Sequence, residues 1–396
     1  MKICFLGYCV DTTKHQYKSN LSGADNQAQL GYIMALEQNA KDRIYVISDY
    51  DCENTSDPNT VECIGKFSLI EYISSVHITC FKKMRKTLRV FKAVILWARK
   101  NKNENKTVFV YNTFVKNFGI LFIVKLFFKI KIIPIIITLP YTIENNNPII
   151  KLKYQIMDRC MKYSIKKCDG IIGITQYVVN ELAPNMCSRV INGGINITKD
   201  INKKNSTMLM KDQNIINITY AGALYARYNL KNIIAALNML PEYNCIFNVF
   251  GVGEEEDYFK KIKAINVHYY GFIEKEKLFN ILCESDILVA LLETGDKLEK
   301  YTFPSKILEY LASGAEILCT DVLSINDDLK KHMHIINNVS PESIAAQIKN
   351  IIDDRNHKLN TDDAQKTLEK KYSWTEAGRQ ALSLAEEIWV KEKDYV

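Results

Sequence analysis

The segment FPSKILEYLASG occupies residues 303–314, and the apolar run EILCTD follows it at residues 316–321. Pro304 suits the first turn of a helix, because its missing N–H would have no partner there. The pattern predicts a helix over Ser305–Ser313 and a buried strand after it. The amides and the positive dipole end of such a helix point out of its start. That end is therefore a natural site for an anion such as a diphosphate.

Three polar side chains accompany the expected helix start. Ser305 offers a hydroxyl and Lys306 a cation, while Glu309 lies one turn further on. At that distance a carboxylate can accept hydrogen bonds from ribose hydroxyls while phosphates lie at the helix start. On physical grounds alone, an ordinary surface helix with a conventional N-terminus explains the segment equally well.

Short apolar runs of the same kind recur along the chain and alternate with amphipathic stretches. The runs are rich in Ile, Val and Tyr and end at Gly, Asp, Asn or Pro, which is typical of buried parallel strands. Their alternation with helical patterns predicts doubly wound α/β layers. The expected strands are KICFLGYC, RIYVISD, TVFVYN, KIIPIIITLP, GIIGIT, NITYAGAL, IFNVFG, HYYGF, DILVALL and EILCTD. Helices are expected at 27–39, 118–128, 154–167, 230–240, 275–283, 305–313, 341–352 and 373–390.

The chain is too long for one ordinary core, since it has 396 residues, so two domains are expected. The strand rhythm pauses in the polar residues 195–214 and restarts at Ile216. We predict an N-terminal Rossmann-like domain at 1–195, a linker at 196–215, a C-terminal Rossmann-like domain at 216–372 and a last helix within 373–396.

The composition is that of an ordinary globular protein, with 47% hydrophobic and 24% charged residues. The eleven cysteines are scattered and form no CxxC pair. The N-terminal run MKICFLGYCV is short and is interpreted as a buried strand, not as a secretory signal. We therefore expect reduced thiols in a cytoplasmic protein.

Charge is distributed unevenly. Residues 1–200 hold 28 basic and 16 acidic residues, whereas residues 201–396 hold 24 and 29. Between Tyr72 and Ile143 there are 14 basic residues and a single acid, Glu104. A core-facing helix with a solvated basic face explains this, and so does peripheral contact of residues 82–131 with an anionic membrane. No stacking platform or recognition motif accompanies the charge, so a nucleic-acid partner is not expected.

The segment FPSKILEYLASG resembles the donor-binding segment of glycosyltransferase family 4, a group with the GT-B fold that retains anomeric configuration. Other segments are similar to that family and follow its order. They are ITYAGALYARYNLKNIIAAL (218–237), VFGVGEEE (249–256), VHYYGFIEKEKLFNILCESDILV (267–289), GIIGITQYVVNELAP, VINGGIN (190–196) and YSWTEAG. The resemblance is strong over 216–321 and weak over 1–150. It implies two domains facing across a cleft, with the last helix packing back on the N-terminal domain.

The resemblance also implies roles for single residues. Glu309 would hold the ribose, Gly222 would let the phosphates approach the backbone, and Arg227 would pair with the diphosphate. Tyr228 stands where the family often has a lysine, so Lys231 or Lys306 would supply the second cation. The implied donor-binding set is Gly222, Ala223, Arg227, Lys231, Gly271, Phe272, Phe303, Pro304, Ser305, Lys306 and Glu309, with Arg227 and Lys306 as the catalytic cations.

Two positions depart from the family pattern. Tyr301 stands where the first of two paired glutamates is usual, and the nearby Glu299 and Glu293 are out of register. In the N-terminal half, the central strand ends in TLPYT and lacks the histidine that often follows it, which leaves Tyr141 or Thr142 near the cleft edge.

The N-terminal loop SNLSGADNQAQL fits a strand–loop–helix turn, in which Gly23 permits a tight turn and Asp25 or Asn26 caps the helix. The family uses this region near the acceptor, so Gly23, Ala24, Asp25 and Tyr141 form the expected acceptor side. A simple helix cap explains each single residue equally well. No GxGxxG motif supports a nicotinamide site, and the pair His332 and His334 has no obvious further metal ligands.

The resemblance implies transfer of a sugar from a UDP- or GDP-linked donor, with no separate cofactor or metal. The basic N-terminal half suggests an acceptor held at a membrane, which would be a glycan or a lipid-linked glycan in cell-surface polysaccharide assembly at the inner face of the cell membrane. Two alternatives stay open. The first, motivated by Tyr301, is a non-catalytic GT-B partner that binds a nucleotide sugar or scaffolds a transferase. The second is a nucleotide-sugar epimerase, for which the expected array of acid/base carboxylates and histidines is not apparent.

Overall fold

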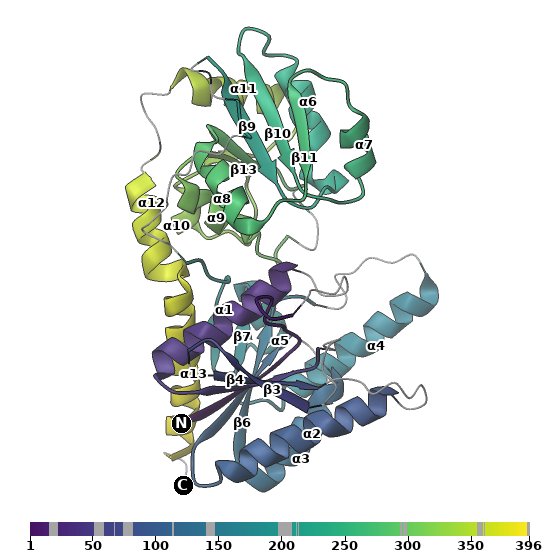
Figure 1. Ribbon diagram of the computed structural model, residues 1–396, viewed down its shortest axis with the longest axis vertical. Coiled ribbons are helices and arrows are strands. Elements are labelled where there is room, and N and C mark those ends of the chain that lie inside the picture. The colour runs from purple at the N-terminus through teal and green to yellow at the C-terminus, as the bar shows by residue number, and fades with distance from the viewer. Residues whose placement is uncertain are drawn as a thin grey trace. The chain divides into compact units, whose positions relative to one another are not determined.

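The computed structural model describes residues 1–15, 23–50, 59–66, 68–73, 82–112, 115–139, 147–196, 208–210, 212, 214–293, 295, 299–354, 359 and 361–393 (Figure 1). These residues divide into two compact units. Unit 1 comprises Met1–Gly194 and Ser373–Val396, and unit 2 comprises Ile195–Tyr372. Most of the expected linker at 196–215 lies outside the described residues.

Unit 1 is built on one sheet whose strand order is β3-β4-β2-β1-β5-β6-β7-β8. Neighbouring strands are parallel, except that β3 runs antiparallel to β4. The central strands β1 and β5 are buried along nearly their whole length, as expected of strands covered on both faces. The strands are β1 (Lys2–Gly7), β2 (Ile44–Ser48), β3 (Asn59–Ile64), β4 (Ser68–Ile73), β5 (Lys106–Tyr111), β6 (Ile130–Ile136), β7 (Ile171–Gly173) and β8 (Ser188–Val190).

Helices cover both faces of the unit 1 sheet. One hydrophobic core lies under α1 and α13, and a second lies under α2 and α3. The helices are α1 (Gly23–Ala40), α2 (Lys82–Lys100), α3 (Val115–Phe128), α4 (Pro148–Ile165), α5 (Gln176–Leu182) and α13 (Trp374–Lys393). None of the helices that the structure describes is long and apolar enough to cross a membrane.

Unit 2 has a parallel sheet in the order β11-β10-β9-β12-β13-β14. Two chain segments wind outward from the centre, so the strand order reverses between β9 and β12, which pair through Ile287 and Ile218. The strands are β9 (Ile216–Ala221), β10 (Cys245–Phe250), β11 (Val267–Gly271), β12 (Ile287–Ala290), β13 (Glu316–Thr320) and β14 (His334–Ile336). In open sheets of this type, ligands bind beyond the carboxyl ends of the strands at such a reversal.

The helical elements of unit 2 are mostly short and amphipathic. Those next to the reversal are η2 (Ala226–Tyr228), α6 (Leu230–Leu237), α8 (Lys275–Glu284) and α9 (Lys306–Ser313). The others are α7 (Glu256–Lys261), α10 (Asp327–Lys330), α11 (Pro341–Asp353), α12 (Thr361–Thr367) and the π-helical turn η4 (Leu368–Tyr372).

The predicted class of two doubly wound parallel-sheet domains is confirmed. The β3–β4 hairpin and the strands β8 and β14 were not predicted from the sequence. Strands β8 and β14 have three residues each, too few for a periodic pattern. Helix α4 was predicted to begin at Tyr154. It starts instead at Pro148, behind an Asn147 side chain that accepts a hydrogen bond from the amide of Ile149.

The C-terminal helix α13 belongs to unit 1, where it packs against α1. The ring of Trp374 fills the space beside Gly31, where an added Cβ would overlap it. Asn39 donates a hydrogen bond to the Thr375 carbonyl at 2.9 Å. One helical turn further on, a Cβ at Gly378 would lie 2.5 Å from the Ala35 carbonyl oxygen. The two helices therefore approach closely because both have glycine at their crossing.

Gly378→Ala tests this crossing. The added methyl group meets backbone, so the helices must separate, and we expect the free energy of unfolding of unit 1 to fall by about 1–3 kcal/mol. Gly119→Ala in α3 is the matched control, because nothing lies within 4 Å of its added Cβ. That change should be neutral or stabilise by up to about 1 kcal/mol through helix propensity. Denaturant unfolding of both variants measures the difference, and equal stabilities would contradict the close crossing.

Candidate functional site

Two glycine-containing loops are pressed together at the carboxyl ends of β9 and β10. The Gly222 amide donates to the Phe250 carbonyl at 2.8 Å, and the Leu224 amide donates to the Val252 carbonyl at 3.0 Å. Gly251 has a φ of +127°, and a Cβ on it would overlap the Gly222 carbonyl. The loop after β9 is thus held against the loop after β10, and close contact between the two backbones requires glycine there.

The Lys306 side chain fills the space above Gly222. Lys306 is the first residue of α9, and its ammonium lies where a Cβ of residue 222 would be. The same ammonium lies 5.2 Å from the ring centroid of Tyr220 and 5.6 Å from that of Tyr228. Aromatic faces attract a cation in this way.

Burial lowers the pKa of Lys306 to about 8; Glu309 opposes the shift and Arg227 adds to it. A lysine with this pKa is still charged at neutral pH, but little solvent surrounds the charge. An anion that reaches this ammonium would therefore interact with it more strongly than with an exposed lysine.

Arg227 lies next to this cation on η2. Its guanidinium is 5.2 Å from the ring centroid of Tyr228 and 6.0 Å from that of Tyr225, and it donates to the Tyr228 hydroxyl at 3.3 Å. The turn that presents it ends at Asn229, which has a φ of +54° and donates from its side chain to the Leu291 carbonyl at 3.0 Å. The loop after β9 is thereby tied to the end of β12.

A cavity of about 200 Å³ opens between these groups, at the reversal of strand order. Arg227, Lys306 and the residues before α9 line it, together with Tyr220 and Tyr228. The structure thus brings together five of the predicted donor-binding residues in one cavity wall: Arg227, Phe303, Pro304, Ser305 and Lys306. Two cations beside aromatic side chains suit a ligand that has an anionic group joined to a less polar part.

The start of α9 contributes less than the sequence suggested. The Ile307 amide donates to the Pro304 carbonyl at 2.9 Å, and the Leu308 amide donates to the Ser305 carbonyl at 3.1 Å. These amides are used in a local turn, so binding of an anion at the helix start would depend on the preceding amides and on the Lys306 ammonium. The helix itself begins one residue later than predicted, at Lys306.

Glu309 lies on the first turn of α9, and Lys275, the first residue of α8, forms an ion pair with its Oε1 at 2.9 Å. The carboxylate is 29% exposed and the lysine side chain 53% exposed, so a ligand can compete for this pair at small cost. The second carboxylate oxygen, Oε2, is not part of this ion pair. Lys275 was not among the residues singled out from sequence.

The other predicted donor-binding residues do not line this cavity. Ala223 accepts a hydrogen bond from the Tyr220 hydroxyl at 2.6 Å through its carbonyl. Gly271 has a φ of +71° and accepts from the Gly251 amide at 2.8 Å, and the side chain of Phe272 is 78% exposed. Lys231 forms an ion pair with Glu255 at 2.7 Å. This engagement leaves Lys306 as the better placed of the two candidates for the second cation.

The glutamates near Tyr301 do not replace the missing one. Glu299 is buried, and its two carboxylate oxygens accept from the amides of Gly295, at 2.8 Å, and Leu323, at 2.7 Å. It therefore ties two loops together. Glu293 is exposed and donates through its backbone amide to the Arg227 carbonyl at 2.8 Å.

In unit 1, Gly23, Ala24 and Asp25 form the first residues of α1. Burial raises the pKa of Asp25. The neighbouring Asn26 holds the segment that follows β1, because its side-chain amide bonds to both the amide and the carbonyl of Val10, at 2.8 and 3.0 Å. Tyr141 lies outside the described residues.

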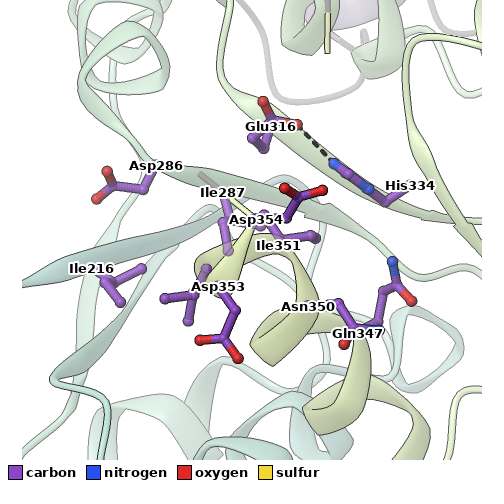
Figure 2. Close-up of a pocket in the computed structure, with 11 residues that line it drawn as sticks. Ile216, Asp286, Ile287, Glu316, His334, Gln347, Asn350, Ile351, Asp353 and Asp354 are labelled. Carbon is purple, nitrogen blue, oxygen red and sulfur yellow. Dashed lines mark hydrogen bonds and ion pairs between the residues drawn. The ribbon is translucent and has the colours of Figure 1, made fainter. Parts of the chain in front are cut away.

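A second cavity, of about 520 Å³, lies at the opposite, amino-terminal edge of the unit 2 sheet (Figure 2). Its wall includes four acidic side chains, Asp286, Glu316, Asp353 and Asp354, and His334 pairs with Glu316 at 2.7 Å. His332 lies 3.6 Å from Asp363, so the two histidines have different partners. Within the described residues no group of three or more His, Cys, Asp or Glu side chains could hold a metal ion. The negative charge of this cavity makes it a poor site for phosphates.

Comparison with known proteins bears on the fold of the whole chain and on the family of unit 2. Residues 201–368 match the family described as "Glycosyl transferases group 1". Sucrose-phosphate synthase from Thermosynechococcus elongatus has a similar fold, with a TM-score of 0.71 and 12% identity over 99% of this chain and 100% of that chain. The Anabaena protein Alr3699/HepE, solved with UDP, has a TM-score of 0.67 and 13% identity over 98% of this chain and 100% of its own.

A third similar structure is the glycosyltransferase from Rickettsia africae ESF-5, with a TM-score of 0.63 and 13% identity over 98% of both chains. No curated protein matches the chain by sequence. The structural likeness shows a GT-B fold, and the family match covers most of unit 2, including the cavity lined by Arg227 and Lys306.

The lowered pKa of Lys306 makes binding of a diphosphate pH-dependent. Its ammonium is charged below its pKa of about 8 and neutral above it. A neutral lysine attracts an anion poorly, so we expect the dissociation constant of a nucleoside diphosphate to rise about tenfold between about pH 7 and about pH 9. Calorimetric titration at several pH values measures this change.

Lys306→Arg is the control for this pH dependence, because a guanidinium keeps its charge over the whole range. The variant should show a flat profile even where its overall affinity is lower. A profile of the native protein that is equally flat would mean that the Lys306 charge does not contribute to anion binding.

Proposed function

We propose that the protein is a glycosyltransferase that moves a sugar from a nucleoside diphosphate to an acceptor hydroxyl. The observation that supports this best is the pair of cations, Arg227 and Lys306, around a cavity at the strand reversal of the domain that matches the glycosyl transferase family. A site of this kind suits a leaving group that becomes more negative as it departs.

In the proposed reaction, the bond between the anomeric carbon and the diphosphate oxygen breaks, and a new bond forms from that carbon to the acceptor oxygen. The acceptor proton leaves, and the electron pair of the broken bond stays on the diphosphate. Lys306 and Arg227 stabilise that charge, because they are held in place by aromatic neighbours before the substrate arrives. Retention of anomeric configuration is proposed from the resemblance to glycosyltransferase family 4.

The donor is proposed to be a UDP- or GDP-sugar. Glu309 would accept hydrogen bonds from the ribose, and the region of Gly271 and Phe272 would meet the base. The Anabaena protein was solved with UDP-glucose as well as UDP, which favours uridine as the first base to test.

The acceptor is proposed to be a glycan or lipid-linked glycan presented at an anionic membrane. The basic helices α2 and α3 support this, because they also expose large apolar side chains, among them Leu88, Leu96, Leu126 and Phe127. Apolar and basic side chains together on exposed helices favour contact with an anionic lipid surface. Assembly of cell-surface polysaccharide on the cytoplasmic face would supply such acceptors.

A second candidate is a GT-B protein that binds a nucleotide sugar without transferring it. The burial of Glu299 between two backbone amides favours this candidate, because it removes the nearest carboxylate that could replace the one missing at Tyr301. Tight binding of a nucleotide with no transfer across a broad panel of donors and acceptors would support this reading.

Calorimetric titration of UDP and GDP into the native protein and two variants tests the proposed donor site. We expect one nucleotide to bind in the micromolar range, and Glu309→Ala and Arg227→Ala each to weaken it about tenfold or more, since each removes a charged hydrogen-bond partner. Lys231→Ala serves as the control, because the Lys231 ammonium is engaged with Glu255.

If neither nucleotide binds the native protein, other nucleotides follow, and failure of all of them rejects the donor site. Binding that survives both the Glu309 and the Arg227 changes would leave the fold intact but make the residue assignments wrong. Loss of binding in Lys231→Ala would restore Lys231 as the second cation.

A further inference from the structure

Helix α4 has an exposed apolar stripe along its length. The stripe consists of Ile149, Leu152, Ile156, Cys160 and Tyr163, which follow one another at spacings of three and four residues and so lie on one side of the helix. Ile149 is 77% exposed, Leu152 57%, Ile156 52% and Tyr163 63%. Singly exposed apolar residues are ordinary, but a continuous stripe of them is not.

In the part of unit 1 that the structure describes, α4 is buried only near its C-terminal end, and the ring of Tyr163 lies 4.4 Å from the Lys167 ammonium. The buried residues of the helix are Met161, Ser164 and Ile165, all in its last two turns. Figure 1 shows the earlier turns running out past the neighbouring elements of unit 1. A helix that needed only solvent on this side would have polar residues there.

Basic side chains border the stripe. At about 100° per residue, Lys153 lies on one side of the stripe and Arg159 on the other, and both are exposed. Asp158 is the single acid of the helix, and it lies 3.3 Å from Lys162 in an ion pair. An exposed apolar stripe with a basic side chain on each side suits a helix that lies in the surface of an anionic bilayer.

We propose that α4 docks unit 1 on an anionic phospholipid surface, with the stripe from Ile149 to Tyr163 entering the boundary between headgroups and acyl chains. This deepens the membrane contact of the proposed function, on which it rests, and it assigns the apolar contact to a helix outside residues 82–131. A second copy of the chain is a poorer occupant, because it would bring like charges at Lys153 and Arg159 together.

Flotation with vesicles tests the proposal. The native protein should bind vesicles of phosphatidylcholine with phosphatidylglycerol and bind pure phosphatidylcholine weakly. The variant Ile149→Ser/Leu152→Ser/Ile156→Ser should bind the anionic vesicles about tenfold less, since partition follows buried apolar area. The control Met239→Ser/Ile265→Ser, which alters exposed apolar residues of unit 2, should bind like the native protein.

A Leu152→Trp variant provides a readout that does not depend on loss of binding. Its fluorescence should shift to shorter wavelength with anionic vesicles and be quenched by brominated acyl chains, because the indole enters the boundary region. Nucleotide affinity, measured separately, should be the same in all these variants, so a failure of the donor site is distinguishable from a failure of the docking surface.

Three outcomes would overturn the proposal. In the first, the serine variant of α4 keeps its vesicle binding while Leu88→Ser/Leu96→Ser/Leu126→Ser loses it, which would assign the contact to α2 and α3. In the second, the native protein forms a dimer that the α4 serine variant abolishes, which would make the stripe a contact between copies. In the third, anionic vesicles bind no better than neutral ones, which would leave an acidic protein as the better partner.

Discussion

The position of one ammonium group decides what unit 2 can bind. Lys306 places its charge directly above the backbone of Gly222, in the space that a side chain at residue 222 would need. The charge is partly removed from water, and the rings of Tyr220 and Tyr228 face it. Loss of water around a cation costs stability, and a bound anion offsets that cost. The glycine, the lysine and the two tyrosines thus act together, although Lys306 is remote from the other three residues in the sequence.

The parallel sheet brings these groups together. Because strand order reverses between β9 and β12, the loops that follow these strands diverge and leave an opening at the carboxyl edge of the sheet. The amino edge has the opposite character, with the acidic cavity that contains Glu316 and Asp353. The unit is therefore electrostatically polarised along its strands, and an anionic ligand is directed to the edge where Lys306 and Arg227 lie.

The sequence alone was sufficient to predict the fold class and the elements that have a local sequence pattern. Long strands with continuous apolar character and a helix that follows Pro304 are local features, and they are found where the pattern predicts them. The roles of Tyr220 and Lys275 could not be predicted in this way, because they depend on which strands and helices are neighbours. The same reason explains Glu299, whose partner Leu323 is remote in the sequence. It also explains Lys231 on α6, which is near Arg227 in the chain but pairs with Glu255 at the start of α7.

A crystal structure of the protein with a bound nucleoside diphosphate is the most direct test of this arrangement. The diphosphate should lie within hydrogen-bond distance of the Lys306 ammonium and the Arg227 guanidinium, with the ribose hydroxyls on the carboxylate of Glu309. A nucleotide bound at the amino edge of the unit 2 sheet, or bound with its phosphates away from Lys306, would contradict the assignment of the site and the proposed function with it.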